Sequence, residues 1–181
     1  MREVKKKWMK IIAPKVLNGV EIGETLYSDP SKVIGRIVWV NIGSLTNDMR
    51  RYYMKLKLNI KEIKGEQAST EVIGYDTVKA HIKRAARKGR SKIEDSFVAE
   101  CKNKVKVRIK PLIVTRYKTK RSILTELRKR TREYYLETCK KTNFEELINF
   151  VINNKVQRDL KKVLKKVFPL AVSEVKTLER I

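Results

Sequence analysis

Residues 54–61 read MKLKLNIK, and this stretch decides the fold class. Its apolar residues are Met54, Leu56, Leu58 and Ile60, and the positions between them are polar. This alternation is typical of a strand in an antiparallel sheet that buries one face and exposes the other. One face is therefore expected to be core, and the other a ladder of lysines.

Patterns on both sides of this stretch predict a β-rich region over residues 20–116. Residues 105–114 alternate in the same way and then become apolar on both faces, as in a strand that enters the interior. Further strands are predicted at 37–42, 66–73 and 93–101, with a weaker candidate at 20–27.

One helix is predicted to interrupt these strands. Val78, Ile82 and Ala85 have helical spacing, Asp76 is a candidate N-cap and Gly89 is a candidate C-cap.

Beyond Arg116 the apolar period changes to that of amphipathic helices. Helices are predicted over 122–140, 144–152 and 156–167, and Thr142 and Glu145 are expected to form a capping box ahead of the second. Residues 170–181 are a candidate final strand. The predicted class is α+β: an antiparallel β-barrel or sandwich core, an inserted helix, and a helical C-terminal third over 120–168.

The domain organisation follows from length and from the first residues. A chain of 181 residues can bury one core of ordinary size. Residues 1–10, MREVKKKWMK, set five cations against one acid without an apolar period. We expect them to form a basic arm that orders on meeting its partner, and residues 11–181 to form a single domain.

Charge is the strongest functional signal. The chain has 44 basic and 20 acidic residues, a net charge of +24. Residues 79–132 alone carry twenty of the cations and only four of the acids. A compact protein with this excess repels itself unless a partner supplies negative charge, and nucleic acid is the expected partner.

Several other classes are excluded. No apolar run approaches the roughly 18 residues that span a bilayer, so no membrane role is expected. Cys101 and Cys139 form no CxxC pair, and with His81 as the single histidine no metal site is predicted. The chain lacks a phosphate-binding GxxxxGK[ST] loop and a paired-carboxylate pattern, so we predict no enzyme and no cofactor.

Two basic loops, 88–92 and 116–121, are the leading candidates for phosphate contact because they mix cations with hydroxyl side chains at junctions of helix and strand. A helix face and the arm extend the candidate set. The predicted RNA-binding residues are Lys5, Lys6, Lys7, Trp8, Arg84, Arg87, Lys88, Arg90, Lys92, Arg116, Tyr117, Lys118, Lys120, Arg121, Arg128 and Arg132.

Each of these assignments has a plainer alternative. A basic run can be an ordinary solvated surface. Trp8 and Tyr117 can stack on splayed bases or can anchor local packing. His81 is expected on the core side of its helix as a packed or hydrogen-bonded residue rather than a general base.

The order of several motifs resembles that of a family of small-subunit ribosomal proteins shared by archaea and eukaryotes, S-three-A-e. The motifs are Trp8, Ala13-Pro14, Ile22 to Leu26, Gly35-Arg36, Leu45 to Asp48, Lys55 to Lys57, Gly74 to Asp76, the strand leading to Thr115, and Phe168 to Leu170. The chain ends at Ile181 without the long extension of the eukaryotic members, so it is similar to the archaeal type.

The resemblance implies a β-barrel with flanking helices, cytoplasmic and ribosome-bound, on the platform of the small subunit. It implies contact with rRNA near the 3′ end, with neighbouring platform proteins and with mRNA near the exit region. The residues alone leave two alternatives open, a free regulatory RNA-binding protein such as a translation factor or chaperone, and an RNA-processing enzyme with an unrecognised site.

Overall fold

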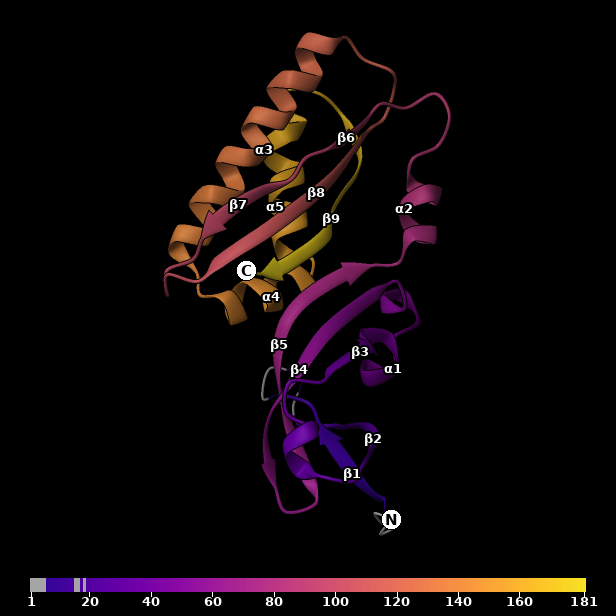
Figure 1. The fold of residues 1–181 in the computed structure, drawn as a ribbon. Coiled ribbons are helices and arrows are strands. Elements are labelled where there is room, and N and C mark those ends of the chain that lie inside the picture. Colours follow the sequence, from indigo (N-terminus) through magenta and orange to yellow (C-terminus); the bar gives the residue numbers. More distant parts are fainter. Residues whose placement is uncertain (1–5, 15–16, 18) are drawn as a thin grey trace. The chain divides into compact units, whose positions relative to one another are not determined.

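A computed structural model describes residues 6–14, 17 and 19–181 and divides the chain into two compact units, Met1–Gly74 and Tyr75–Ile181 (Figure 1). The described strands form a nine-stranded hydrogen-bonded sheet, and β5 (Gln67–Thr77) runs across the boundary between the units. The α+β class, the inserted helix and the helical C-terminal region are confirmed. The path of the described strands does not close on itself, so the sheet is not a closed barrel, and the finer barrel or sandwich description is not confirmed.

In unit 1, the strands follow the order β2-β1-β5-β4-β3. Their bounds are β1 (Lys7–Ile12), β2 (Glu21–Tyr27), β3 (Ile37–Asn41) and β4 (Met54–Lys64), and α1 (Ile42–Thr46) follows β3 directly. The described part of the unit also contains 3-10 turns at Pro30–Lys32 and Met49–Arg51. A turn at Gly65, whose φ of 62° suits glycine, joins β4 to β5.

The core of unit 1 lies on the inward side of these strands. Met9 and Ile11 of β1 pack with Val33, Ile60 and Ala68, all almost fully buried. The alternation at 54–61 is confirmed, because the apolar residues of β4 are buried and the lysines between them are more exposed.

The outer strands β2 and β3 of unit 1 have no ladder between them, and a side chain links them instead. The guanidinium of Arg36, just before β3, donates from Nη1 to the main-chain oxygen of Leu26 and to Oγ1 of Thr25, each at 2.9 Å. This contact joins the two strands through a side chain, without a run of main-chain hydrogen bonds.

The first residues differ from the expected arm. Lys7–Ile12 form β1, which pairs antiparallel with β2 and parallel with β5. The apolar alternation of this strand starts at Met9, within the ten residues that we expected to be an arm. It continues at Ile11, just beyond them. Residues 1–5 lie outside the described part of the chain.

Unit 2 is built around β8 (Lys106–Thr115), which pairs antiparallel with β6 (Lys92–Glu94), β7 (Phe97–Glu100) and β9 (Leu170–Arg180). Its helices are α2 (Lys79–Ala85), α3 (Arg121–Lys141), α4 (Phe144–Ile152) and α5 (Lys155–Lys165). Figure 1 shows α3 alongside β7 and β8, and α3 contacts both β7 and α5. The predicted strand at 93–101 is two strands, β6 and β7, separated at Asp95 and Ser96.

Three predicted helix caps are wrong. Asp76 lies in β5, where its carboxylate accepts a hydrogen bond from the Thr177 hydroxyl at 3.1 Å, and α2 starts later, at Lys79. That helix ends at Ala85, before Gly89. The capping box is one residue further along than expected and is formed by Asn143 and Glu146, with the Asn143 N–H donating to the Glu146 carboxylate at 3.0 Å.

Candidate nucleic-acid interface

The two predicted basic loops lie together in unit 2. Loop 88–92 leads into β6 and loop 116–121 follows β8, and these strands are paired through Lys92 and Val114. Figure 1 shows both loops at the end of the unit where α3 begins.

Hydrogen bonds from Ser91 and Thr115 fix one loop against the other. The Ser91 N–H donates to Oγ1 of Thr115 at 3.0 Å, and the Thr115 hydroxyl donates to the Tyr117 main-chain oxygen at 2.7 Å. The Thr119 N–H donates to Oγ of Ser91 at 3.3 Å, and the Thr115 N–H donates to the Ser91 main-chain oxygen at 2.9 Å. Because Thr115 is fully buried, these bonds are shielded from water and hold the loops as one surface.

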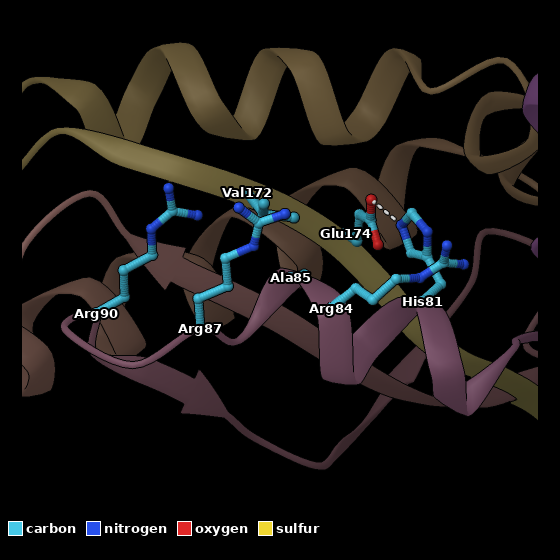
Figure 2. Close-up of a pocket in the computed structure, with 7 residues that line it drawn as sticks. All are labelled: His81, Arg84, Ala85, Arg87, Arg90, Val172 and Glu174. Carbon is cyan, nitrogen blue, oxygen red and sulfur yellow. Dashed lines mark hydrogen bonds and ion pairs between the residues drawn. The ribbon is translucent and has the colours of Figure 1, made fainter.

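A row of three arginines lines a pocket between α2 and β9. Arg84 lies in the last turn of α2, and Arg87 and Arg90 follow in the segment that leads to β6. Figure 2 shows their side chains along the pocket, which His81, Ala85, Val172 and Glu174 also line. No ion pair joins an acidic side chain to any of the three guanidinium groups among the described residues, and Glu174, which lines the same pocket, is paired with His81.

Two contacts hold α2, which carries Arg84, against β8 and β9. Ile82 of α2 packs on Leu112 and Val114 of β8, with Val172 of β9 against them. His81 lies 2.9 Å from the Glu174 carboxylate, between Nε2 and Oε1, and ties α2 to β9 (Figure 2). His81 is hydrogen-bonded, as predicted. Its partner Glu174 was not predicted, because no local pattern connects residues so far apart in the chain.

Lys92 differs from the other predicted contacts because it has an acidic partner. Its ammonium lies 3.2 Å from Glu94, which also pairs with Lys176 at 3.4 Å. Burial opposes ionisation of Glu94, but the hydrogen bond with Lys92 and the charges of Lys176 and Lys92 outweigh it and lower the pKa of that carboxyl. Glu94 thus stays charged and offsets part of the Lys92 charge.

The second loop presents exposed cations around an exposed ring. Tyr117 is 59% exposed, and the Arg116 guanidinium lies 5.8 Å from the ring centroid. Lys118, Lys120 and Arg121 are also exposed. The ring therefore remains available for stacking, and the prediction that it stacks on a base stays a prediction.

The α3 residues divide into different environments. Arg128 is exposed, whereas the guanidinium of Arg132 lies 5.5 Å from the centroid of the buried Phe97 ring. Arg132 thus takes part in packing as well as carrying charge.

The predicted contacts of the N-terminal region belong to unit 1. Lys6, Lys7 and Trp8 are exposed, Trp8 by 63%, and Lys5 lies outside the described residues. The remaining predicted contacts all lie in unit 2.

Comparison with known proteins identifies the family of the chain. A family model, the ribosomal S3Ae family, matches residues 3–180. The chain belongs to the ribosomal S3Ae family. Its relatives include the small ribosomal subunit protein eS1 of Nanoarchaeum equitans, 35% identical over 91% of this chain and 83% of the relative. The eS1 proteins of Methanobrevibacter smithii and Methanothermobacter thermautotrophicus are 33% and 30% identical over 94% of this chain, and over 88% and 87% of their own lengths.

Membership of the S3Ae family confirms the resemblance found in the sequence, including the archaeal type. Within the part of the chain that the structure describes, no cluster of three or more His, Cys, Asp or Glu residues is arranged to hold a metal ion. Nor does any described helix combine the length and apolar character needed to cross a membrane.

Proposed function

We propose that this chain is a structural component of the small ribosomal subunit and binds rRNA through the basic surface of unit 2. The observation that carries the proposal is the row of Arg84, Arg87 and Arg90 around one pocket without acidic partners among the described residues. Guanidinium groups in such a row suit the phosphates of a folded RNA backbone. The names of the archaeal relatives support the ribosomal context.

The proposed surface combines this row with the two loops. Its phosphate contacts are Arg84, Arg87, Lys88, Arg90, Arg116, Lys118, Lys120, Arg121 and Arg128, with Lys92 and Arg132 as weaker members, and Lys5, Lys6, Lys7 and Trp8 add a contact from unit 1. The role is binding rather than catalysis, because phosphate contacts fix a protein on RNA without any reacting group.

The finer location follows from the family resemblance. It is the platform of the small subunit in the cytoplasm, near the 3′ end of the rRNA and the mRNA exit region, beside other platform proteins. A net charge of +24 fits this setting because the phosphates of the surrounding rRNA supply the negative charge that balances it.

A sucrose gradient of native extract tests the proposal. We expect the chain to migrate with small subunits at physiological salt at about one copy per subunit, because many simultaneous contacts make dissociation slow. Release at high salt is also expected, since each phosphate contact is weakened by counterions. A chain found mostly in the soluble fraction would contradict the structural role and support a regulatory RNA-binding protein instead.

A further inference from the structure

The outward side of β3 and β4 in unit 1 carries large apolar side chains that are exposed to solvent. Trp39 is 50% exposed and Ile37 is 51% exposed, both on β3. Val40 on β3 and Leu56 and Leu58 on β4 are buried, so they mark the inward side. The cross-strand pairs Ile37–Asn59, Trp39–Lys57 and Asn41–Lys55 form the outward side, here called the Trp39 face.

A lysine is placed beside the exposed indole of the Trp39 face. The Lys57 ammonium lies 5.7 Å from the centroid of the Trp39 ring. This is a cation–π contact, with the ammonium over one face of the ring. Exposed aromatic rings among cations are how proteins hold single-stranded nucleic acids, because bases stack on the rings and phosphates bind the cations.

A second exposed ring lies near one end of the same face. The Asn41 side-chain amide donates to the main-chain oxygen of Tyr52 at 2.8 Å, and Tyr52 is 47% exposed. Asn41 is two positions from Trp39 on the same side of β3, a step of about 6.7 Å along a strand. A second exposed aromatic residue, which follows the Met49–Arg51 turn, is therefore held near the Asn41 end of β3.

The charge of this region favours a polyanion over an apolar partner. Lys55 is exposed on the Trp39 face, and the chain as a whole carries a net charge of +24. An apolar protein interface excludes charge from its centre, whereas here a lysine lies against the central ring.

We propose that the Trp39 face is a binding site for single-stranded RNA, with a base stacked on Trp39 and the adjoining phosphate bound by Lys55 and Lys57. The site extends the proposed RNA-binding function, on which it rests, from the basic surface of unit 2 to unit 1. It selects unpaired RNA, because the bases of a duplex are already stacked on one another and cannot cover the indole.

The test measures binding of the full chain to a short oligouridylate and to an RNA duplex of mixed sequence. We expect Trp39→Ala to lower affinity for the single strand about 10-fold and to leave duplex affinity unchanged, as loss of one stacking ring should. Trp39→Phe keeps an aromatic surface and should retain most of the affinity. Val20→Ala, which trims an exposed apolar side chain of unit 1 outside β3 and β4, is the matched control. In a Trp8→Phe background, oligouridylate should also quench the fluorescence of Trp39.

Two results would overturn this inference. One is single-strand affinity that does not change in Trp39→Ala while circular dichroism shows a folded chain. The other is small subunits that carry Trp39→Ala and lack a neighbouring protein while oligouridylate affinity is intact, which would make the face a protein interface. Variants of Arg84, Arg87 and Arg90 measured in parallel keep the two proposals apart, because they test the basic surface of unit 2 alone.

Discussion

The Ser91 N–H donates a hydrogen bond to the buried Thr115 hydroxyl at 3.0 Å, so the two basic loops of unit 2 share one anchor. The same hydroxyl donates to the main chain of Tyr117 at 2.7 Å. The anchor therefore uses both the donor and the acceptor capacity of a single side chain.

Replacement of Thr115 by valine keeps the shape of the side chain and removes its hydroxyl. We expect the free energy of unfolding to fall by about 1–3 kcal/mol, because a buried N–H and a buried carbonyl lose their partner. RNA affinity should fall as well, since the loops are no longer fixed to each other. Denaturant unfolding and RNA titration measure the two effects. Thr125→Val, which removes an exposed helix hydroxyl bonded to Arg121, is the control and should change stability by no more than about 0.5 kcal/mol.

Replacement of Arg84, Arg87 and Arg90 by glutamine should weaken binding to structured RNA and reduce its salt dependence. Each lost phosphate contact should lower the slope of log affinity against log salt by about 0.7 to 0.9. Lys32→Gln and Lys162→Gln remove cations that are paired with Asp29 and Asp159, and they should alter the slope less. A slope that stays at the wild-type value in the triple variant would place the phosphate contacts elsewhere.

Cys101 and Cys139 should resist alkylation in the folded protein. Both thiols are free and buried, and burial is the main cause of their raised pKa, which reaches about 12 for Cys139 with a further contribution from Cys101 beside it. The thiolate is the reactive form, so iodoacetamide at pH 8 should modify the unfolded chain much faster than the folded one. Rapid modification of the native protein, measured by mass spectrometry, would contradict this burial.

The raised pKa of Cys139 also predicts a pH dependence of stability. In the unfolded chain the thiol loses its proton near its ordinary pKa of 9.0, whereas in the folded chain it keeps the proton to about 12. The folded state therefore binds more protons in this window, and the contribution of this thiol to stability is present below pH 9 and is lost as the pH rises toward 12. Cys139→Ala should unfold with a weaker pH dependence over that range in denaturant titrations.

Replacement of Gly43 by alanine should destabilise unit 1. A Cβ at this position would lie 2.6 Å from Cδ2 of the Tyr52 ring and 2.8 Å from the Tyr52 main-chain nitrogen. We expect a loss of about 1–3 kcal/mol in the free energy of unfolding, as is usual for overpacking. The double variant with Tyr52→Ala separates the causes. Trimming the ring relieves the first contact but not the second, so full recovery of stability would show that the backbone contact is harmless.

Regular patterns in the sequence predicted most of the elements. The alternation of β4 and the helical periods beyond Arg116 are local signals, because one buried face repeats apolar residues at the period of the element. Both are confirmed. Caps were harder to predict, because Thr142 and Asn143 are both good cap residues and the packing of Phe144 decides between them.

The candidate site was predictable as a charge excess but not as a geometry. The cations of residues 79–132 were visible, whereas the bonds from Ser91 to Thr115 and from His81 to Glu174 join residues that are distant in sequence. The exposure of Trp39 was missed for a related reason. Its strand is apolar at most positions, so only the register with Lys57 reveals which side faces outward.

The parallel pairing of β1 with β5 constrains how the chain can fold as it is synthesised. Lys10, Ile11 and Ile12 pair with Gln67, Ala68 and Ser69, which are translated long after them, while β2 is available almost at once. A nascent chain can therefore form the β1–β2 hairpin early but must leave one edge of β1 unpaired until β5 has been made. Closure of such a distant contact carries a loop-entropy cost and slows folding. Unit 1 therefore cannot be completed until β5 has been synthesised, and until then the edge of β1 is open to wrong partners.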